Sequence, residues 1–329
     1  MIRFGLLGAG RIGQIHGRNA AASPKGTLVA IADPFPKGAE SLAAATGAQV
    51  RDVDAIFSSK DIDAVMICTP TTTHAEFIER AAMAGKAIFC EKPVDLDSKR
   101  VEKTLKVVEK SGVALMVGFN RRFDPNFGAL KARIDEGVAG NVELVTILSR
   151  DPGAPPVSYI ATSGGLFRDM MIHDLDMARF LLGEEPVEVH AVGSSIVDPE
   201  IGKAGDVDTA AVLLKTASGK ICQISNSRRA TYGYDQRIEV HGSKGLLTAG
   251  NVLETTVKFA SKTGISADPV QNFFLERYDA AYRNEMNAFI DAVMNKKAPN
   301  PSGHDGLMAL VLADAAQKSH ETGKAVKLG

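Results

Sequence analysis

The sequence predicts two domains of different class. The first is an α/β domain with a doubly wound parallel sheet, and the second is an α+β domain whose sheet is open and mainly antiparallel, with helices on one face. Short apolar strands alternate with helical segments through about the first 120 residues, the pattern of a parallel sheet. After Arg122 the strands follow one another with only short turns between several of them. Because 329 residues can form two cores, we expect domains over 1–121 and 122–329.

The strands expected in the first domain all end at one edge of its sheet. They cover residues 2–8, 27–32, 63–69, 87–90 and 113–119, with helices at 12–22, 75–84 and about 98–111. Ligands of doubly wound sheets bind beyond the carboxyl ends of the strands. Binding residues should therefore lie where these five strands end.

The second domain is expected to alternate strands with tight turns. Its strands are predicted at 142–149, 187–197, 207–216, 220–226 and 237–241, with turns at 217–219 and 242–245. Helices are predicted at 126–136, 166–182, about 275–294 and 305–321. This is the pattern of an antiparallel sheet with added helices.

A glycine run, Gly8-Ala9-Gly10-Arg11-Ile12-Gly13, follows the first strand and opens the first helix. Gly8 permits a tight turn, Gly10 permits close approach of a pyrophosphate, and Gly13 permits close packing of helix and strand. The pyrophosphate would bind at the positive end of the helix. The run therefore predicts a dinucleotide site.

Asp33 decides which dinucleotide is expected. It ends the second strand, 20 positions after Gly13, where a carboxylate can bind the ribose hydroxyls and repel a 2′-phosphate. We predict NAD rather than NADP, although Asp33 could simply open the following Asp-Pro turn. The residues assigned to cofactor binding are Gly8, Gly10, Arg11, Ile12, Gly13, Asp33, Thr69 and Glu91.

Composition excludes several classes of protein. A formal charge of −1 gives no electrostatic reason to expect nucleic acid or an anionic membrane as partner. Cys68, Cys90 and Cys222 have no CxxC spacing, so buried thiols in a reducing, cytoplasmic compartment are expected rather than disulfides or a zinc site. No apolar run approaches membrane-spanning length.

The helix predicted at 166–182 carries a polar face with Asp169, His173 and Asp176 at spacings of 4 and 3. Such a face is often only solvated, but a carboxylate four residues before a histidine can also orient and charge-stabilise its imidazole. Asp174 lies off this face, and there is no HExxH motif or cysteine cluster, so we predict no metal.

Lys92, in the run Glu91-Lys92-Pro93 after the fourth strand, completes the expected chemistry. Oxidation of an alcohol requires a base for the hydroxyl proton, and His173 suits that role, with Asp169 holding its tautomer. Lys92 would stabilise the negative charge that develops on the oxygen. Its alternative role is an ion pair with Glu91 or a surface position.

These residues resemble the Gfo/Idh/MocA oxidoreductases over nearly the whole chain. The run 8–13, Glu91-Lys92-Pro93 and the pair Asp169 and His173 match three family motifs in order and separation. The resemblance implies an N-terminal Rossmann domain, a catalytic triad of these last two residues with Lys92, and a homotetramer. An open sheet face that needs covering also favours an oligomer.

Segments 150–156, 163–174 and 274–285 resemble the inositol 2-dehydrogenase branch of that family. This implies oxidation of myo-inositol to scyllo-inosose. A polyol requires several converging donors and acceptors, and we expect Asp176, Arg122 and Tyr282 to contribute beside the triad. Arg122 could instead pair with an acid, and Tyr282 could only pack.

Two other functions remain open at this point. The first is a dehydrogenase of the same fold that acts on another inositol epimer or a sugar. The second is a non-catalytic, NAD-sensing regulatory protein, which would need none of Lys92, Asp169 and His173. Turnover in an absorbance assay distinguishes the two classes.

Overall fold

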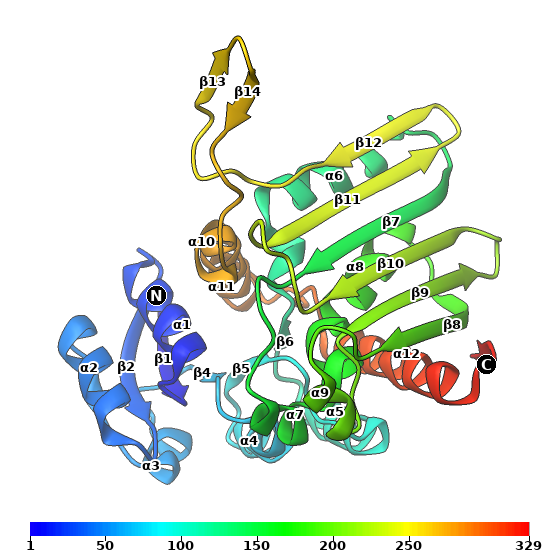
Figure 1. Cartoon of the computed structure of the whole chain (residues 1–329). Helices are drawn as coiled ribbons and strands as arrows, with labels where there is room; N and C mark the ends of the chain where they lie inside the picture. Colours follow the sequence, from blue (N-terminus) through cyan, green and yellow to red (C-terminus); the bar gives the residue numbers. More distant parts are fainter. Residues whose placement is uncertain (329) are drawn as a thin grey trace. The chain divides into compact units, whose positions relative to one another are not determined.

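The computed structural model describes residues 1–328, which form two compact units (Figure 1). The first unit comprises Met1–Phe123 and Ala281–Leu310, and the second comprises Asp124–Ala280 and the chain from Val311 onward. The single division expected after residue 121 does not anticipate the return of the chain to the first unit.

The first unit is a six-stranded parallel sheet in the order β3-β2-β1-β4-β5-β6. Its strands are β1 (Ile2–Leu7), β2 (Gly26–Ala32), β3 (Gln49–Val50), β4 (Ala64–Ile67), β5 (Ala87–Glu91) and β6 (Leu115–Gly118). Every residue of β4, β5 and β6 is buried, as strands covered on both faces require. The doubly wound parallel sheet is confirmed.

Helices alternate with these strands, and a helix from late in the chain joins them. They are α1 (Arg11–Ala22), α2 (Pro36–Thr46), α3 (Val53–Ser58), α4 (His74–Met83), α5 (Ser98–Ser111) and α11 (Asp279–Met294), with short 3₁₀ turns at Thr71–Thr73 and Asn120–Phe123. Met286, Phe289 and Ile290 of α11 enter the core formed by the sheet. Burial of these apolar side chains explains why the chain returns to this unit.

The second unit is a seven-stranded sheet in the order β12-β11-β7-β10-β9-β8-β15. Its strands are β7 (Val142–Arg150), β8 (Pro186–Ser194), β9 (Thr209–Thr216), β10 (Ile221–Ser227), β11 (Asp235–Gly242), β12 (Gly245–Ala249) and β15 (Val326–Lys327). All neighbours are antiparallel except β7 and β10. The mainly antiparallel sheet is confirmed, and the two predicted turns close the β9–β10 and β11–β12 hairpins.

The remaining elements of the second unit are helices and a separate hairpin. The helices are α6 (Pro125–Asp135), α7 (Val157–Ser163), α8 (Ile172–Leu182), α9 (Pro199–Lys203), α10 (Phe274–Arg277) and α12 (Gly303–Thr322), whose first turns belong to the first unit. The hairpin of β13 (Lys258–Ser261) and β14 (Gly264–Ala267) stands apart from the large sheet in Figure 1, and all of its residues are exposed.

Two helices differ from the sequence prediction. The segment predicted as one helix over 275–294 breaks at Tyr278 into α10 and α11. The segment predicted as one helix over 166–182 begins as a π-helical turn, Leu166–Met170, before α8. In this turn the Met171 N–H donates to the Leu166 carbonyl, five residues back, instead of four. Hydrophobic periodicity does not distinguish these two hydrogen-bond patterns.

Candidate active site

Three glycines shape the loop between β1 and α1, each for a different reason. Gly8 has φ +89°, and a Cβ there would lie 2.5 Å from the Cys68 carbonyl oxygen. A Cβ on Gly13 would lie 2.0 Å from the Gly8 carbonyl oxygen. A Cβ on Gly10, by contrast, would meet no atom within 4 Å. Gly8 and Gly13 are therefore required by the fold, whereas Gly10 borders open space.

The amino end of α1 fits an anionic group. Gly10 is the N-cap residue, and no side chain caps the helix. The first backbone N–H groups and the positive end of the helix dipole are thus available to a phosphate. The Gln14 side chain donates to the carbonyls of Ala9 (3.1 Å) and Gly38 (2.9 Å), which holds the loop against the start of α2.

Asp33 lies at the carboxyl end of β2, and its carboxylate accepts two backbone hydrogen bonds. Its Oδ2 accepts a hydrogen bond from the Ala9 N–H at 2.6 Å, which ties it to the glycine loop. Its Oδ1 accepts from the Phe35 N–H at 2.7 Å, which closes the Asp-Pro turn. The carboxylate is thereby fixed beside the glycine loop, the position in which the sequence analysis assigned it to the ribose.

Lys92 follows β5 and is partly buried. The residue before it, Glu91, is buried, and its Oε1 lies 2.7 Å from Nε2 of His16 on α1. Gly118 leaves room for this carboxyl group, because a Cβ there would lie 3.1 Å from it. The Glu91 side chain thus contacts His16, a residue to which the sequence analysis gave no role.

The loop after β4 is fixed by short polar contacts. Thr69 Oγ1 lies 2.7 Å from Thr73 Oγ1, and Thr73 Oγ1 donates to the Pro70 carbonyl. His74, which begins α4, lies 2.7 Å from the carbonyl oxygens of both Thr69 and Pro93. Its position at a helix start just after a strand's carboxyl end was the signal that could have identified it.

The two other sequence candidates in this unit have structural partners. Arg122 pairs with Asp305 at 2.9 Å and donates to Asn300 at 2.7 Å, the acid pairing weighed as its alternative. The Tyr282 ring is buried edge-on against His16, at 5.6 Å between ring centroids. For both residues, a contact with substrate stays a prediction.

The cysteines of this region are not reactive groups. Burial raises the pKa of the Cys68 and Cys90 thiols, and the charge of Glu91 raises both further. Both remain neutral, buried thiols at physiological pH. All three cysteines are free.

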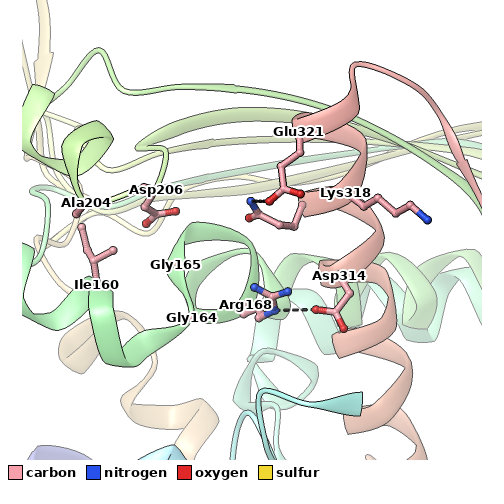
Figure 2. Close-up of a pocket in the computed structure, with 11 residues that line it drawn as sticks. Ile160, Gly164, Gly165, Arg168, Ala204, Asp206, Asp314, Lys318 and Glu321 are labelled. Atoms are coloured by element: carbon pink, nitrogen blue, oxygen red, sulfur yellow. Dashed lines mark hydrogen bonds and ion pairs between the residues drawn. The ribbon is translucent and has the colours of Figure 1, made fainter. Parts of the chain in front are cut away.

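In the second unit, the π-helical turn that carries Asp169 is held at its first residue, Leu166, and at its third residue, Arg168. The Leu166 N–H donates to both carboxylate oxygens of Asp206, at 3.0 and 3.1 Å. Gly165 precedes it with φ +80°, and a Cβ there would lie 2.6 Å from Asp206 Oδ1. Arg168 donates to Asp314 of α12 at 2.7 Å, shown by a dashed line in Figure 2.

Behind Asp206 lies a buried cation that the sequence did not reveal. Arg228 is 2% exposed and pairs with Asp206 at 3.8 Å. Asp206 therefore contacts both the first residue of the turn and a buried guanidinium. The amino end of the turn is thus bonded to a protein side chain rather than to solvent.

The predicted dyad, Asp169 and His173, is partly buried. The Tyr159 hydroxyl donates to Asp169 Oδ1 at 3.2 Å. Asp176, expected on a shared polar face, is buried at 1% exposure and lies 3.6 Å from Arg179. Asp174 is also buried and accepts from Asn226 at 3.0 Å. α8 buries most of its residues, so it has no solvated face of the kind considered as the alternative.

A hollow of about 560 Å³ in the second unit borders this turn. It is bordered by Gly164, Gly165, Arg168, Asp206 and Asp314, but neither Asp169 nor His173 lines it (Figure 2). Among residues 1–328, no group of three or more His, Cys, Asp or Glu side chains is arranged to hold a metal. No helix in the same range is long and apolar enough to cross a membrane.

Comparisons with known proteins match both units over nearly their full length. Residues 2–119 match the NAD-binding Rossmann fold of the Gfo/Idh/MocA oxidoreductase family, and residues 131–328 match that family's C-terminal alpha/beta domain. The chain is 59% identical to an inositol 2-dehydrogenase of Rhizobium meliloti over 97% of this chain and 96% of that protein. It is 46% identical to a myo-inositol 2-dehydrogenase of Thermotoga maritima over 99% and 98%.

A solved structure with bound ligands is also similar. It is the scyllo-inositol dehydrogenase of Lactobacillus casei with NAD(H) and scyllo-inositol, 33% identical with a TM-score of 0.92 over 99% of both chains. The similarity covers both units rather than only the dinucleotide-binding one.

Proposed function

Because the chain belongs to the Gfo/Idh/MocA oxidoreductase family, we propose that it is an NAD-dependent dehydrogenase that oxidises myo-inositol to scyllo-inosose. One observation carries the choice of substrate: the chain is 59% and 46% identical, over nearly its whole length, to two inositol 2-dehydrogenases. The bound scyllo-inositol and NAD(H) of a 33% identical structure support the same class of substrate and cofactor.

The residues of the first unit fit NAD. The open space at Gly10 and the uncapped amino end of α1 suit a pyrophosphate, and the fixed carboxylate of Asp33 suits a ribose diol. The pyrophosphate site would be completed by Gly8, Arg11, Ile12 and Gly13. We also assign Thr69, which follows β4, and Glu91, which ends β5, to cofactor binding. NAD, when bound, supplies the acceptor for the hydride that leaves the substrate carbon.

The chain's own residues hold and move the proton. His173 Nε2 or Nδ1 takes the hydroxyl proton, and Asp169 orients the ring and stabilises the imidazolium that forms. The Lys92 ammonium donates to the same substrate oxygen and stabilises its developing negative charge. Holding Asp169 on a turn anchored at Leu166 and Arg168 limits its movement during this transfer.

For substrate binding, Asp176 is the further residue we assign beside the triad, as an acceptor for a hydroxyl. We also assign Tyr282 to substrate binding, through a hydrogen bond from its hydroxyl. Arg122 already binds Asp305 and Asn300, so we give it the role of bracing its loop, with substrate contact as the alternative.

We further propose a homotetramer. The face of the large sheet that carries Val192, Leu213 and Ile221 leaves these apolar side chains 42–59% exposed. The β13–β14 hairpin exposes Phe259 and Ile265, at 69% and 75%. A second copy of the chain would cover both surfaces. A cytoplasmic location stays the prediction made from the separated cysteines.

An absorbance assay of NADH formation tests the function. The purified protein with NAD is given myo-inositol, scyllo-inositol, D-chiro-inositol, glucose and xylose at mildly alkaline pH. We expect the highest kcat/KM with myo-inositol. Turnover of only another polyol or sugar of this panel would support the reaction but assign a different substrate. Absence of turnover with all five compounds, despite NAD binding, would favour the non-catalytic NAD-sensing function.

A Lys92→Ala variant tests the mechanism in the same assay. Loss of a donor to the developing oxyanion lowers kcat about 10²- to 10³-fold. Turnover at the unmodified rate would refute the role assigned to Lys92. Lys99→Ala, which alters an exposed lysine at the start of α5, is the matched control and should keep full activity.

A further inference from the structure

His74 joins two loops of the first unit that carry residues assigned to the active site. It is 2% exposed, at the start of α4. Its Nε2 lies 2.7 Å from the Thr69 carbonyl oxygen, and its Nδ1 lies 2.7 Å from the Pro93 carbonyl oxygen. The ring therefore spans from the loop after β4 to the turn after β5.

Each of these contacts requires a donor on the histidine, because carbonyl oxygens only accept. A neutral imidazole has one N–H and an imidazolium has two. Burial lowers the pKa of His74, and Lys92 acts in the same direction, whereas the two carbonyls and Glu91 oppose them. In either protonation state the ring can donate to at least one loop, which an apolar ring cannot do.

Lys92 lies between two residues that buried histidines hold. On one side the Glu91 carboxylate is 2.7 Å from His16 Nε2, and on the other the Pro93 carbonyl is 2.7 Å from His74 Nδ1. A buried histidine therefore contacts the side chain of the residue before Lys92 and another contacts the backbone carbonyl of the residue after it. The direction in which the lysine side chain leaves the backbone depends on these two anchors.

We propose that His74 is a positioning residue for Lys92, which holds the Lys92–Pro93 turn in place through the Pro93 carbonyl. The inference rests on the proposed function, in which the Lys92 ammonium stabilises charge on the substrate oxygen. Displacement of a catalytic group by about 1 Å can cost 10²-fold in rate. His74 thus contributes to kcat without touching substrate or cofactor.

Two conservative variants separate the two contacts. In His74→Asn the amide nitrogen can occupy the position of Nδ1 and donate to Pro93, whereas in His74→Gln it reaches the position of Nε2 and donates to Thr69. We expect His74→Asn to keep most of kcat, and His74→Gln to lose about 10- to 100-fold, with KM for the polyol little changed in both. His304→Gln, an exposed histidine at the start of α12, is the control.

Equal kcat in the two variants would overturn the proposal, because the Pro93 contact would then have no special effect. A further comparison uses Lys92→Met as background. If His74 acts through Lys92, His74→Gln causes no further loss of kcat there. A full additional loss in that background would instead assign His74 a general structural role.

Hydrogen exchange separates failure of this inference from failure of the proposed function, because it does not depend on turnover. Peptides that cover residues 90–95 should exchange faster in His74→Gln than in the unmodified protein, with peptides of the second unit unchanged. Unchanged exchange at 90–95 would refute the anchoring by His74. Absence of turnover with every polyol, together with faster exchange, would refute only the proposed function.

Discussion

At the scale of single residues, Gly10 and Gly13 are glycines for different physical reasons. A Cβ on Gly13 would overlap the Gly8 carbonyl oxygen, whereas a Cβ on Gly10 would meet nothing. Gly10 also has φ −68°, which any residue can adopt. The fold therefore does not require a glycine at position 10, and we expect the open space there to serve the approach of a ligand.

A Gly10→Ala variant should consequently fold normally and bind NADH poorly. We expect the thermal midpoint to be unchanged or slightly raised, because alanine reduces the entropy of the unfolded chain. The Kd for NADH should rise at least about tenfold, or about 1.4 kcal/mol. Fluorescence titration measures this, with Gly250→Ala, also in open space, as the control. Unchanged affinity would place the pyrophosphate elsewhere.

Asp235 of β11 makes the stability of the fold depend on pH in the acid range. Burial alone would raise the pKa of Asp235, but hydrogen bonds from Arg237, Tyr232 and Asn251 outweigh it and lower the pKa to about 2. A folded pKa below the unfolded value of about 3.9 stabilises the fold at higher pH. This contribution is complete above about pH 4 and is lost as the pH falls toward 2.

In an Asp235→Asn variant this pH dependence should be missing. We expect a lower thermal midpoint than in the unmodified protein at pH 7, and a smaller further decrease between pH 5 and pH 3, because one titrating carboxylate has been removed. Calorimetric scans at both pH values measure the difference. Equal decreases in the two proteins would show that Asp235 is not the group responsible.

At the scale of elements, the π-helical turn Leu166–Met170 depends on a side chain far away in sequence. Asp206, from the connection between α9 and β9, accepts the Leu166 N–H at the amino end of the turn. The Arg168–Asp314 pair is more exposed and so contributes less to its stability. Asp206 is thus the main anchor of the segment that carries Asp169.

An Asp206→Ala variant should lose both stability and rate. Removal of the carboxylate that accepts the Leu166 N–H should lower the free energy of unfolding by about 0.5–2 kcal/mol. The value of kcat should also fall, because Asp169 is no longer held in place. Asp198→Ala removes a comparable cap from α9, where Asp198 accepts from Glu200 at 2.9 Å, and should lose stability but not kcat. Thermal midpoints and kcat of both variants test this. Equal kcat in the two would show that the turn needs no anchor.

The elements were predictable to different degrees. Five of the six strands of the first unit follow from apolar runs and lie within a few residues of the expected positions, whereas β3, α2 and α3 were not predicted. The π-helical turn and the break at Tyr278 were not predictable, since periodicity does not specify the hydrogen-bond pattern. The parallel pairing of β7 and β10 also depends on tertiary contacts, because the two strands are about 70 residues apart in sequence.

At the scale of the whole molecule, the second unit leaves one face of its sheet exposed. Val192 of β8, Leu213 of β9 and Ile221 of β10 present apolar side chains there, at 59%, 51% and 42% exposure. The helix α8 packs on β7 and β10, whose buried side chains face it. A charge placed on the exposed face should therefore affect assembly more than folding.

A Leu213→Glu variant tests the proposed homotetramer. Light scattering should give the mass of a tetramer for the unmodified protein and a smaller mass for the variant, because a charge in an apolar interface is unfavourable. Circular dichroism should be unchanged. Met83→Glu, which changes an exposed residue at the end of α4, should keep the original mass. A monomer mass for the unmodified protein would contradict the proposal.

The sequence by itself determined the fold class, the glycine loop, the Asp33 position and the motifs that carry Lys92, Asp169 and His173. Each depends on local spacing along one strand, turn or helix, which a linear pattern records. Only the tertiary structure decided three sets of contacts. His16 and His74 contact Glu91 and Pro93, the residues on either side of Lys92. Asp206 and Arg228 anchor the turn that carries Asp169, and Asp176 is buried beside Arg179. These contacts join segments up to 75 residues apart, and their energies depend on burial and distance, which no local pattern specifies.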